Sequence, residues 1–281
     1  MKRKILAIAV TVLAFAGIPA QAQEYSWSYG AIDGSRTGCV STMKDNVFQS
    51  LGNVADGVYH APNGTSYPEY SLTAKVASLL LDAQPRMAHV KEVIAYAPKS
   101  MKAARPESDL SNWFVDLVMK KVENLSGKKI DVGICNYGGI RAEIPQGYVI
   151  LDDILSMFPF DNTLYYVQIK GKDLREIFEG MASRKTFEVL GGVRIVVCDD
   201  KIKTIHVGEE PLDDERVYSV ASISFLYEGG DKVALAPVAV SAEQYDIFIR
   251  EAVLEHIKTL TDNRQNIEYS TDGRIVYETS K

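Results

Sequence analysis

The run CNYGGIRAEIPQG at residues 135–147 contains residue types that can hold a small anion. Gly138 and Gly139 allow the backbone to approach a ligand closely and to present N–H donors to it. Arg141 supplies a planar, permanently charged guanidinium that suits phosphate or carboxylate, and Asn136 adds an amide directly after a strand-like run. A tight turn with a structural arginine has the same spacing, so these residues alone leave both interpretations open.

Two further segments combine a phenylalanine with polar residues in a turn-like setting. They are FPFDNTL (158–164), with Phe160 and Asn162, and SFLYEGGD (224–231), with Phe225 and Asp231. An exposed aromatic ring can stack on a flat base, a contact worth roughly 1–3 kcal/mol by alanine substitution, and a nearby carboxylate can bind sugar hydroxyls. Taken singly, each phenylalanine is better explained as a core residue.

The sequence contains no recognisable metal or nucleophile motif. Its histidines and cysteines are scattered, without HExxH or CxxC spacing, and there is no GxSxG, SxxK, P-loop or GxGxxG run. These residues are His60, His89, His206, His256, Cys39, Cys135 and Cys198. We therefore expect neither a bound metal nor a covalent nucleophile in this chain, and one disulfide stays possible without a predicted pairing.

Composition and charge exclude several classes of protein. The chain has 281 residues, of which 46% are hydrophobic and 24% charged, as in ordinary globular proteins. Its formal net charge of −6 disfavours a general nucleic-acid binder. No apolar run of about 20 residues occurs beyond the extreme N-terminus, so no membrane span is expected after it.

The first 22 residues have the pattern of a secretory signal peptide. Lys2, Arg3 and Lys4 precede an apolar stretch over 5–18, and Ala20-Gln21-Ala22 follows as a cleavage signal. We expect an exported protein, periplasmic or extracellular.

Hydrophobic spacing predicts alternating helices and strands, hence an α/β or mixed α+β fold. A helical pattern over 72–94 is interrupted by Pro85, and a connector over 97–106 suggests a boundary. We therefore divide the mature chain into an N-terminal extension, 23–104, and a domain over 105–281. Other predicted elements are helices near 109–124, 151–157, 172–181 and 244–260, strands near 130–135, 163–169, 193–197, 201–207 and 217–225, and a hairpin at Asp272-Gly273.

Four stretches, in order, resemble the C-terminal domain of the 5′-nucleotidases. They are RPESDLSNWFVDLV (105–118), NYGGIRAEIPQG (136–147), FPFDNTLYYVQIKGKDLREIFE (158–179) and YSVASISFLYEGGD (218–231). They cover about half of the chain, and residues 84–101 resemble the linker helix that precedes this domain. The resemblance implies a nucleotide-binding domain with a mixed sheet and flanking helices.

The resemblance also implies a role for individual residues. Asn136 and Arg141 match residues on the phosphate side, in the loop that holds Gly138 and Gly139. Phe160 and Phe225 match a pair that sandwiches the base. Asn162 matches a residue that contacts the base edge, Asp231 one that contacts the ribose hydroxyls, and Gly191 a glycine that lines the pocket. Arg105 corresponds to the arginines that the family often has just before the helix near 109–124, but it is about one residue out of register. Tyr137 departs from the family, which usually has a small residue there.

The family's catalytic half is a metallophosphoesterase domain with a two-metal site, whose metals clamp the attacking and leaving oxygens. The roughly 80 residues before Arg105 lack its motifs. We therefore expect the exported recognition half of a 5′-nucleotidase in nucleotide catabolism, binding a nucleoside 5′-monophosphate or a nucleoside. A separate metallophosphoesterase chain would hold the divalent metals, with no cofactor in this chain.

A non-catalytic periplasmic nucleotide- or nucleoside-binding protein is the main alternative. The third interpretation is a protein that keeps the fold but whose pocket no longer binds a ligand. Whether the chain is itself an enzyme stays open.

Overall fold

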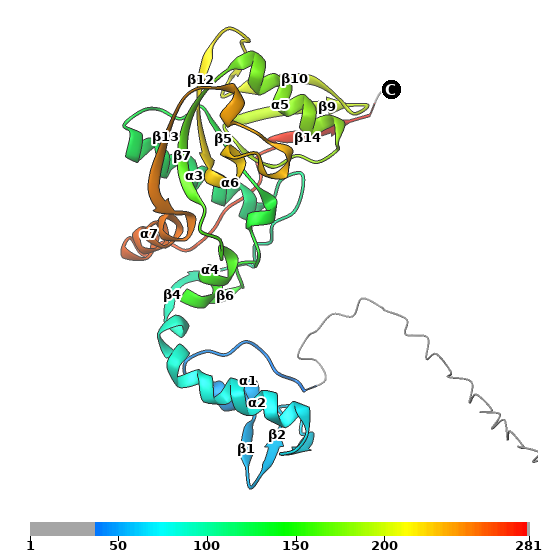
Figure 1. The fold of residues 1–281 in the computed structure, drawn as a ribbon, viewed down its shortest axis with the longest axis vertical. Coiled ribbons are helices and arrows are strands. Elements are labelled where there is room, and N and C mark those ends of the chain that lie inside the picture. The colour runs from blue at the N-terminus through cyan, green and yellow to red at the C-terminus, as the bar shows by residue number, and fades with distance from the viewer. Residues whose placement is uncertain (1–36, 280–281) are drawn as a thin grey trace, which may run out of the picture.

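The computed structural model describes residues 37–279, so the predicted signal peptide lies outside the described residues. A small N-terminal unit over residues 37–92 projects from a larger domain that contains the main sheets (Figure 1). Among the helices described, none is long and apolar enough to cross a membrane.

The N-terminal unit packs one helix against a short three-stranded sheet. Its elements are α1 (Val47–Leu51), β1 (Asn53–Ala55), β2 (Val58–His60), β3 (Ser66–Pro68), α2 (Leu72–Ala83) and the 3₁₀ segment η2 (Gln84–Lys91). The Ser71 side chain caps α2 by accepting from the Ala74 N–H. The predicted interruption at Pro85 is confirmed, because α2 ends just before it and continues only as a 3₁₀ turn.

Helix α2 buries its small side chains and exposes its large ones. The small Ala74 and Ala77 face the sheet, where they form a core with Tyr59 and Ala61. The large apolar residues of the helix, Leu72, Val76, Leu79 and Leu80, are exposed. The large buried side chain of this core is therefore the Tyr59 ring from the sheet, and α2 contributes only alanines to it.

The main sheet has five strands in the order β13-β7-β12-β5-β8. Their bounds are β13 (Ala239–Phe248), β7 (Thr163–Lys170), β12 (Val217–Ile223), β5 (Val132–Cys135) and β8 (Val189–Gly191). Only β12 and β5 run parallel, and the other neighbouring strands are antiparallel. The sheet is therefore mixed, and the predicted mixed α/β class is confirmed.

Helix α3 (Asp109–Ser126) packs along the main sheet and contacts β5, β7, β8 and β12. Ser108 caps its start by accepting from the Ser111 N–H. Gly127 ends it with a left-handed φ of 66°. Helix α7 (Ile249–Asp262) packs on α3.

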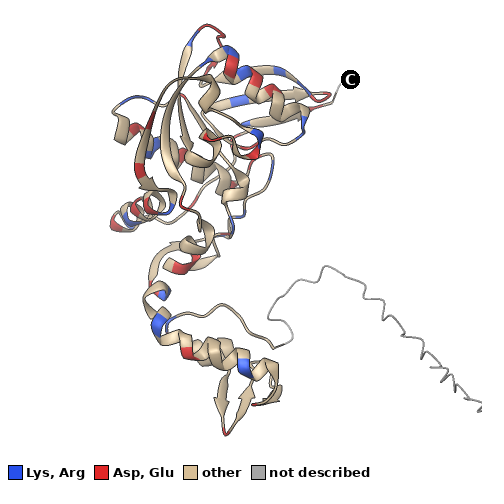
Figure 2. Cartoon of the chain, viewed as in Figure 1, with Lys and Arg blue, Asp and Glu red and all other residues tan. Residues whose placement is uncertain are grey.

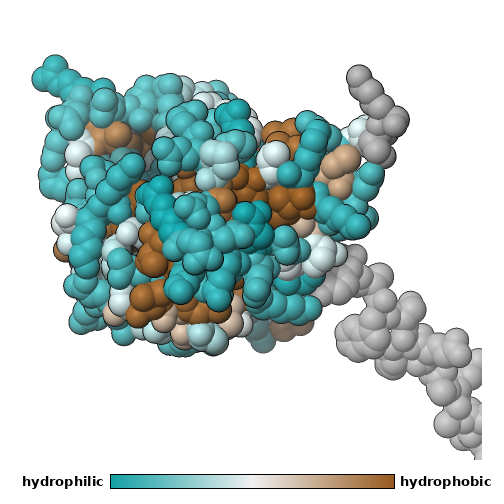
Figure 3. Space-filling view, turned by 90° about the horizontal axis from the view of Figure 1, so that it is seen from above, coloured by the Kyte–Doolittle hydropathy of each residue, from teal (hydrophilic) through white to brown (hydrophobic). Residues whose placement is uncertain are grey.

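A second sheet has the order β11-β10-β9-β14. Its strands are β11 (Glu210–Pro211), β10 (Lys201–Val207), β9 (Val193–Cys198) and β14 (Ile275–Glu278), and helix α5 (Gly171–Ser183) contacts β10. The pair β4 (Val93–Ala97) and β6 (Gly147–Ile150), followed by α4 (Leu151–Met157), connects the N-terminal unit to the main domain. Seen from above, hydrophilic side chains cover most of the molecule and an apolar band crosses it (Figure 3).

Two predictions near the C-terminus are wrong. Residues 239–248 form strand β13, paired with β7, so the last long helix begins at Ile249 rather than at Gln244. No hairpin forms at Asp272-Gly273, because β14 pairs in parallel with β9 instead of folding back on the preceding residues. In both cases pairing with a distant strand overrides the local pattern.

Candidate functional site

Six of the residues predicted from sequence line one cavity of about 260 Å³. They are Asn136, Gly138, Phe160, Asn162, Phe225 and Asp231. Because these residues come from segments up to 95 positions apart, their convergence is a result of the fold and not of the local sequence.

Three strand ends in the main sheet position the cavity. Asn136 directly follows β5, and Phe225 lies in α6 (Ser224–Tyr227), which directly follows β12. Since β5 and β12 are parallel, their carboxyl ends lie at the same edge of the sheet. Strand β7 is antiparallel to β12 and pairs Leu164 with Ile223, so the segment with Phe160 and Asn162 enters at this edge too.

The two phenylalanines remain accessible instead of joining the core. Phe160 is 47% exposed and Phe225 is 39% exposed, and within residues 37–279 neither ring stacks on another aromatic ring. The Phe225 ring lies directly over Gly230, where a Cβ atom would come within 2.4 Å of it. Arg250 holds the other segment by pairing with Asp161 at 2.6 Å and donating to the Phe160 carbonyl at 3.4 Å.

Asn136 and Asp231 form the polar side of the cavity. The Asn136 Nδ2 donates to Asp231 Oδ2 at 2.9 Å. Asn136 is only 4% exposed, and its buried Oδ1 has no hydrogen-bond partner among the described residues. Asp231 and Lys232 both have left-handed φ values, 50° and 60°, which are costly for residues with a side chain. An unpaired buried acceptor and local strain are features that binding sites retain.

Asn162 is held by its neighbours at the entrance to β7. Its Oδ1 accepts from the Ser224 hydroxyl at 3.4 Å, and that hydroxyl accepts from the Thr163 N–H at 3.2 Å. The Asn162 Nδ2 has no hydrogen-bond partner in the described part of the chain. It can therefore donate to an acceptor on a ligand.

A second cleft, of about 630 Å³, shares Gly138 and Asp231 with the first cavity. It is also lined by Arg105, Tyr137, Arg184, Glu188 and Lys232. Neither Arg184 nor Lys232 has an ion-pair partner among residues 37–279. The sequence analysis did not identify either residue. No motif surrounds Arg184, and the only signal for Lys232 is that it directly follows Asp231.

Arg105 reaches this cleft, but a buried carboxylate already pairs with it. Its Nη2 donates to Glu188 Oε1 at 2.9 Å, and its guanidinium lies 4.4 Å from the centre of the Tyr137 ring. Glu188 also accepts from the Tyr137 N–H at 2.8 Å. The Tyr137 hydroxyl donates towards the carbonyls of Ala104 and Pro106, each at 3.0 Å, and burial raises its pKa. Tyr137 is thus held on both its backbone and its hydroxyl and forms a buried floor of this cleft.

Three predicted residues lie outside the lining of both clefts. Arg141 is exposed, and its Nη1 donates to the Gly138 carbonyl at 3.4 Å. Gly139 packs against Asn136, where a Cβ atom would come within 2.7 Å of Oδ1. Gly191, in β8, packs instead against Met119 of α3. Their contacts with a ligand stay predictions.

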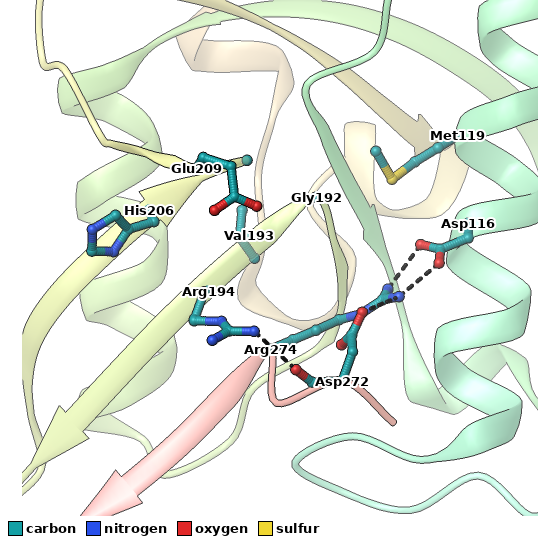
Figure 4. Close-up of a pocket in the computed structure, with 10 residues that line it drawn as sticks. Asp116, Met119, Gly192, Val193, Arg194, His206, Glu209, Asp272 and Arg274 are labelled. Atoms are coloured by element: carbon teal, nitrogen blue, oxygen red, sulfur yellow. Dashed lines mark hydrogen bonds and ion pairs between the residues drawn. The ribbon is translucent and has the colours of Figure 1, made fainter. Parts of the chain in front are cut away.

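A further cavity of about 600 Å³ lies between α3 and the second sheet (Figure 4). Its central residue is Arg274, which is 6% exposed and donates to both oxygens of Asp116, at 2.8 and 2.6 Å. Arg274 also bonds Asp272, and Tyr269 donates to Asp116. Because these charges satisfy one another, we interpret this cluster as a structural link between α3 and the C-terminal segment.

The candidate metal ligands do not assemble in the described part of the chain. Among residues 37–279, no three His, Cys, Asp or Glu side chains come together as a metal site. Cys39, Cys135 and Cys198 are all free.

Comparison with known proteins identifies the domain. The family model for the 5′-nucleotidase C-terminal domain matches residues 86–237. The chain is 27% identical over 184 residues to the trifunctional nucleotide phosphoesterase protein YfkN of Bacillus subtilis, covering 60% of this chain and 12% of that protein. It is 25% identical over 164 residues to a 5′-nucleotidase of Vibrio vulnificus, covering 56% of this chain and 29% of that protein.

Among solved structures, the chain resembles a 5′-nucleotidase precursor from Thermus thermophilus. The TM-score is 0.64 at 26% identity, over 79% of this chain and 45% of that one. The chain thus spans less than half of that structure and less than a third of the two curated relatives. Since the family model covers more than half of the present sequence, the chain belongs to the 5′-nucleotidase C-terminal domain family.

Proposed function

We propose that this chain is the nucleotide-recognition half of a 5′-nucleotidase. It binds a nucleoside 5′-monophosphate in the cavity at the ends of β5, β7 and β12. The observation that carries the proposal is the convergence in that cavity of two exposed phenylalanines and the bonded pair Asn136–Asp231. A base can stack between two aromatic rings, and a ribose diol can donate to a carboxylate. This one cavity offers both the rings and the carboxylate.

The polar groups suggest how the nucleotide is oriented. The base enters between Phe160 and Phe225, with Asn162 donating to its edge. The ribose hydroxyls donate to Asp231. The phosphate then extends past Gly138 towards the cleft that contains Arg184 and Lys232, whose charges have no partner within the described residues. Arg141 adds an exposed guanidinium beside Gly138.

Hydrolysis is assigned to a separate metallophosphoesterase chain in this proposal. The His, Cys, Asp and Glu side chains of residues 37–279 do not form a set that fits a two-metal centre, so we derive no hydrolytic step through them. Divalent metals belong to the partner chain, and export to the periplasm or the extracellular space follows from the signal-like pattern of residues 1–22.

Calorimetric titration of the purified protein with AMP and then with adenosine, without added metal, tests the recognition role. Both ligands should bind, and AMP should bind more tightly. Phe160→Ala should weaken both ligands about 5- to 140-fold, the equivalent of roughly 1–3 kcal/mol of stacking. Phe48→Ala removes another exposed phenylalanine, from the N-terminal unit, and should leave affinity unchanged. Absence of heat with either ligand would contradict the proposal.

A nucleoside-binding protein without a catalytic partner is the second candidate. The Arg105–Glu188 pair favours it, because the buried carboxylate offsets a cation that would otherwise face a phosphate. Adenosine that binds as tightly as AMP, with no phosphate released in the presence of candidate metallophosphoesterases, would support this candidate over the first.

A further inference from the structure

The outer face of α2 presents large apolar side chains to solvent. Leu72 is 80% exposed and Leu79 is 71% exposed, while Ala74 and Ala77 face the sheet of the N-terminal unit. The other members of this outer row are Val76 and Leu80. Single exposed apolar residues are common, but a contiguous row on one helix face marks an interaction surface.

The row runs along most of the helix. Leu72, Val76 and Leu79 follow one another at intervals of four and three residues, and Leu80 lies one turn after Val76, so their side chains form one stripe. Only two charged residues, Lys75 and Asp82, interrupt the apolar character of α2 (Figure 2). The helix lies well away from the main domain, and its main contacts are with other elements of the N-terminal unit (Figure 1).

We propose that this face pairs with the α2 helix of a second copy of the chain, in an antiparallel arrangement about a two-fold axis. Lys75 and Asp82 are seven residues apart, about two turns, so both lie along the same edge of the apolar row. Neither has an ion-pair partner in the part of the chain described.

An antiparallel pairing centred between Ser78 and Leu79 uses both charges. It places each Lys75 level with the partner's Asp82, on the same side of the two helices, and therefore forms two equivalent ion pairs. A parallel pairing would set Lys75 level with the same residue of the other helix and would leave both charges unpaired. The charge pattern thus selects a two-fold, self-complementary contact.

The area available fits a modest interface. A standard interface buries about 800 Å² per partner, and α2 is about 18 Å long. A helix of this length buries less than that area by itself, so the residues before and after α2 must also contribute to the interface. Tyr70 precedes its cap and is largely exposed, and Met87 follows its end, so each end of the helix can extend the contact. We expect a dimer that dissociates on dilution.

Sedimentation equilibrium of the purified protein over about a hundredfold range of concentration tests this inference. The unmodified chain should move from dimer towards monomer on dilution. Leu79→Glu should weaken the dimer about a hundredfold or more, because it introduces a charge twice into the apolar seam. Circular dichroism should be unchanged, since Leu79 is exposed in the isolated chain.

Charge reversal tests the antiparallel register separately. Lys75→Glu should weaken the dimer about tenfold, because two ion pairs become two repulsions. Adding Asp82→Lys should restore it, and Lys201→Glu, an exposed reversal on β10, should have no effect. A monomer at every concentration, or a dimer indifferent to Leu79→Glu, would overturn the proposal in favour of a different occupant. Failure of the double reversal to rescue would overturn the antiparallel pairing.

Discussion

Gly230 controls the position of the Phe225 ring, which makes Gly230→Ala a direct test of the base sandwich. A Cβ atom at this position would lie 2.4 Å from two ring atoms and 2.5 Å from a third. The backbone of Gly230 does not require glycine, because no positive φ is recorded there. Because the ring is 39% exposed and not part of the core, we expect the substitution to move the ring out of the cavity and to cost little stability.

The expected loss equals that of one stacking face. Stacking is worth about 1–3 kcal/mol per base, which corresponds to a rise in the dissociation constant of adenosine of about 5- to 140-fold. Calorimetry should give this rise for Gly230→Ala and a similar one for Phe225→Ala. In the Phe225→Ala background, Gly230→Ala should have no further effect, because the two changes act on the same ring. Wild-type adenosine affinity in Gly230→Ala would refute the reasoning, and additive losses would show that Gly230 acts by another route.

Three other predictions concern charge. Arg141→Ala should weaken AMP more than adenosine in calorimetry, and equal losses would refute a phosphate role. Arg274→Met leaves Asp116 without its cationic partner and should lower stability by about 3 kcal/mol, seen as a fall in melting temperature of about 6–12 °C. Lys203→Ala, which removes an exposed ion pair, should leave the melting temperature unchanged. Burial lowers the pKa of His256, so the unfolded state takes up its proton first and stability should fall as pH drops below about 6.5. Urea unfolding at pH 7 and pH 5 should show a smaller pH effect in His256→Gln, and an unchanged pH effect would contradict this origin.

The part of the site nearest the strand ends could be predicted from sequence. Asn136, Phe160 and Phe225 each lie next to an apolar run that the structure confirms as a strand or its immediate extension. The end of a strand fixes the direction of the next residue, so predicting the strand also predicts where the following site residue lies. The second cleft, which contains Arg105, Arg184 and Lys232, could not be predicted in the same way. Arg105 and Glu188 are 83 residues apart and meet only through tertiary packing.

The errors in the fold have a similar origin. Residues 244–248 fit a helical spacing, yet Gln244 pairs with Tyr165 because β7 accepts an antiparallel partner on that side. The spacing over 72–94 correctly predicted a helix, but it does not tell which face of α2 is buried, since that depends on the side chains of the sheet opposite. A local signal was reliable where it fixes backbone geometry, as at Pro85, where α2 gives way to a 3₁₀ segment.

The cavity exists only while β5, β7 and β12 are aligned, because each contributes one of its walls. Any ligand that occupies it therefore binds the folded chain and not the unfolded one, and its binding energy adds to the free energy of unfolding. At a ligand concentration of 100 times the dissociation constant this linkage amounts to about 2.7 kcal/mol, or a rise in melting temperature of about 5–10 °C. Thermal shift with a panel of purine and pyrimidine nucleosides would accordingly rank their affinities and reveal the base preference without any turnover.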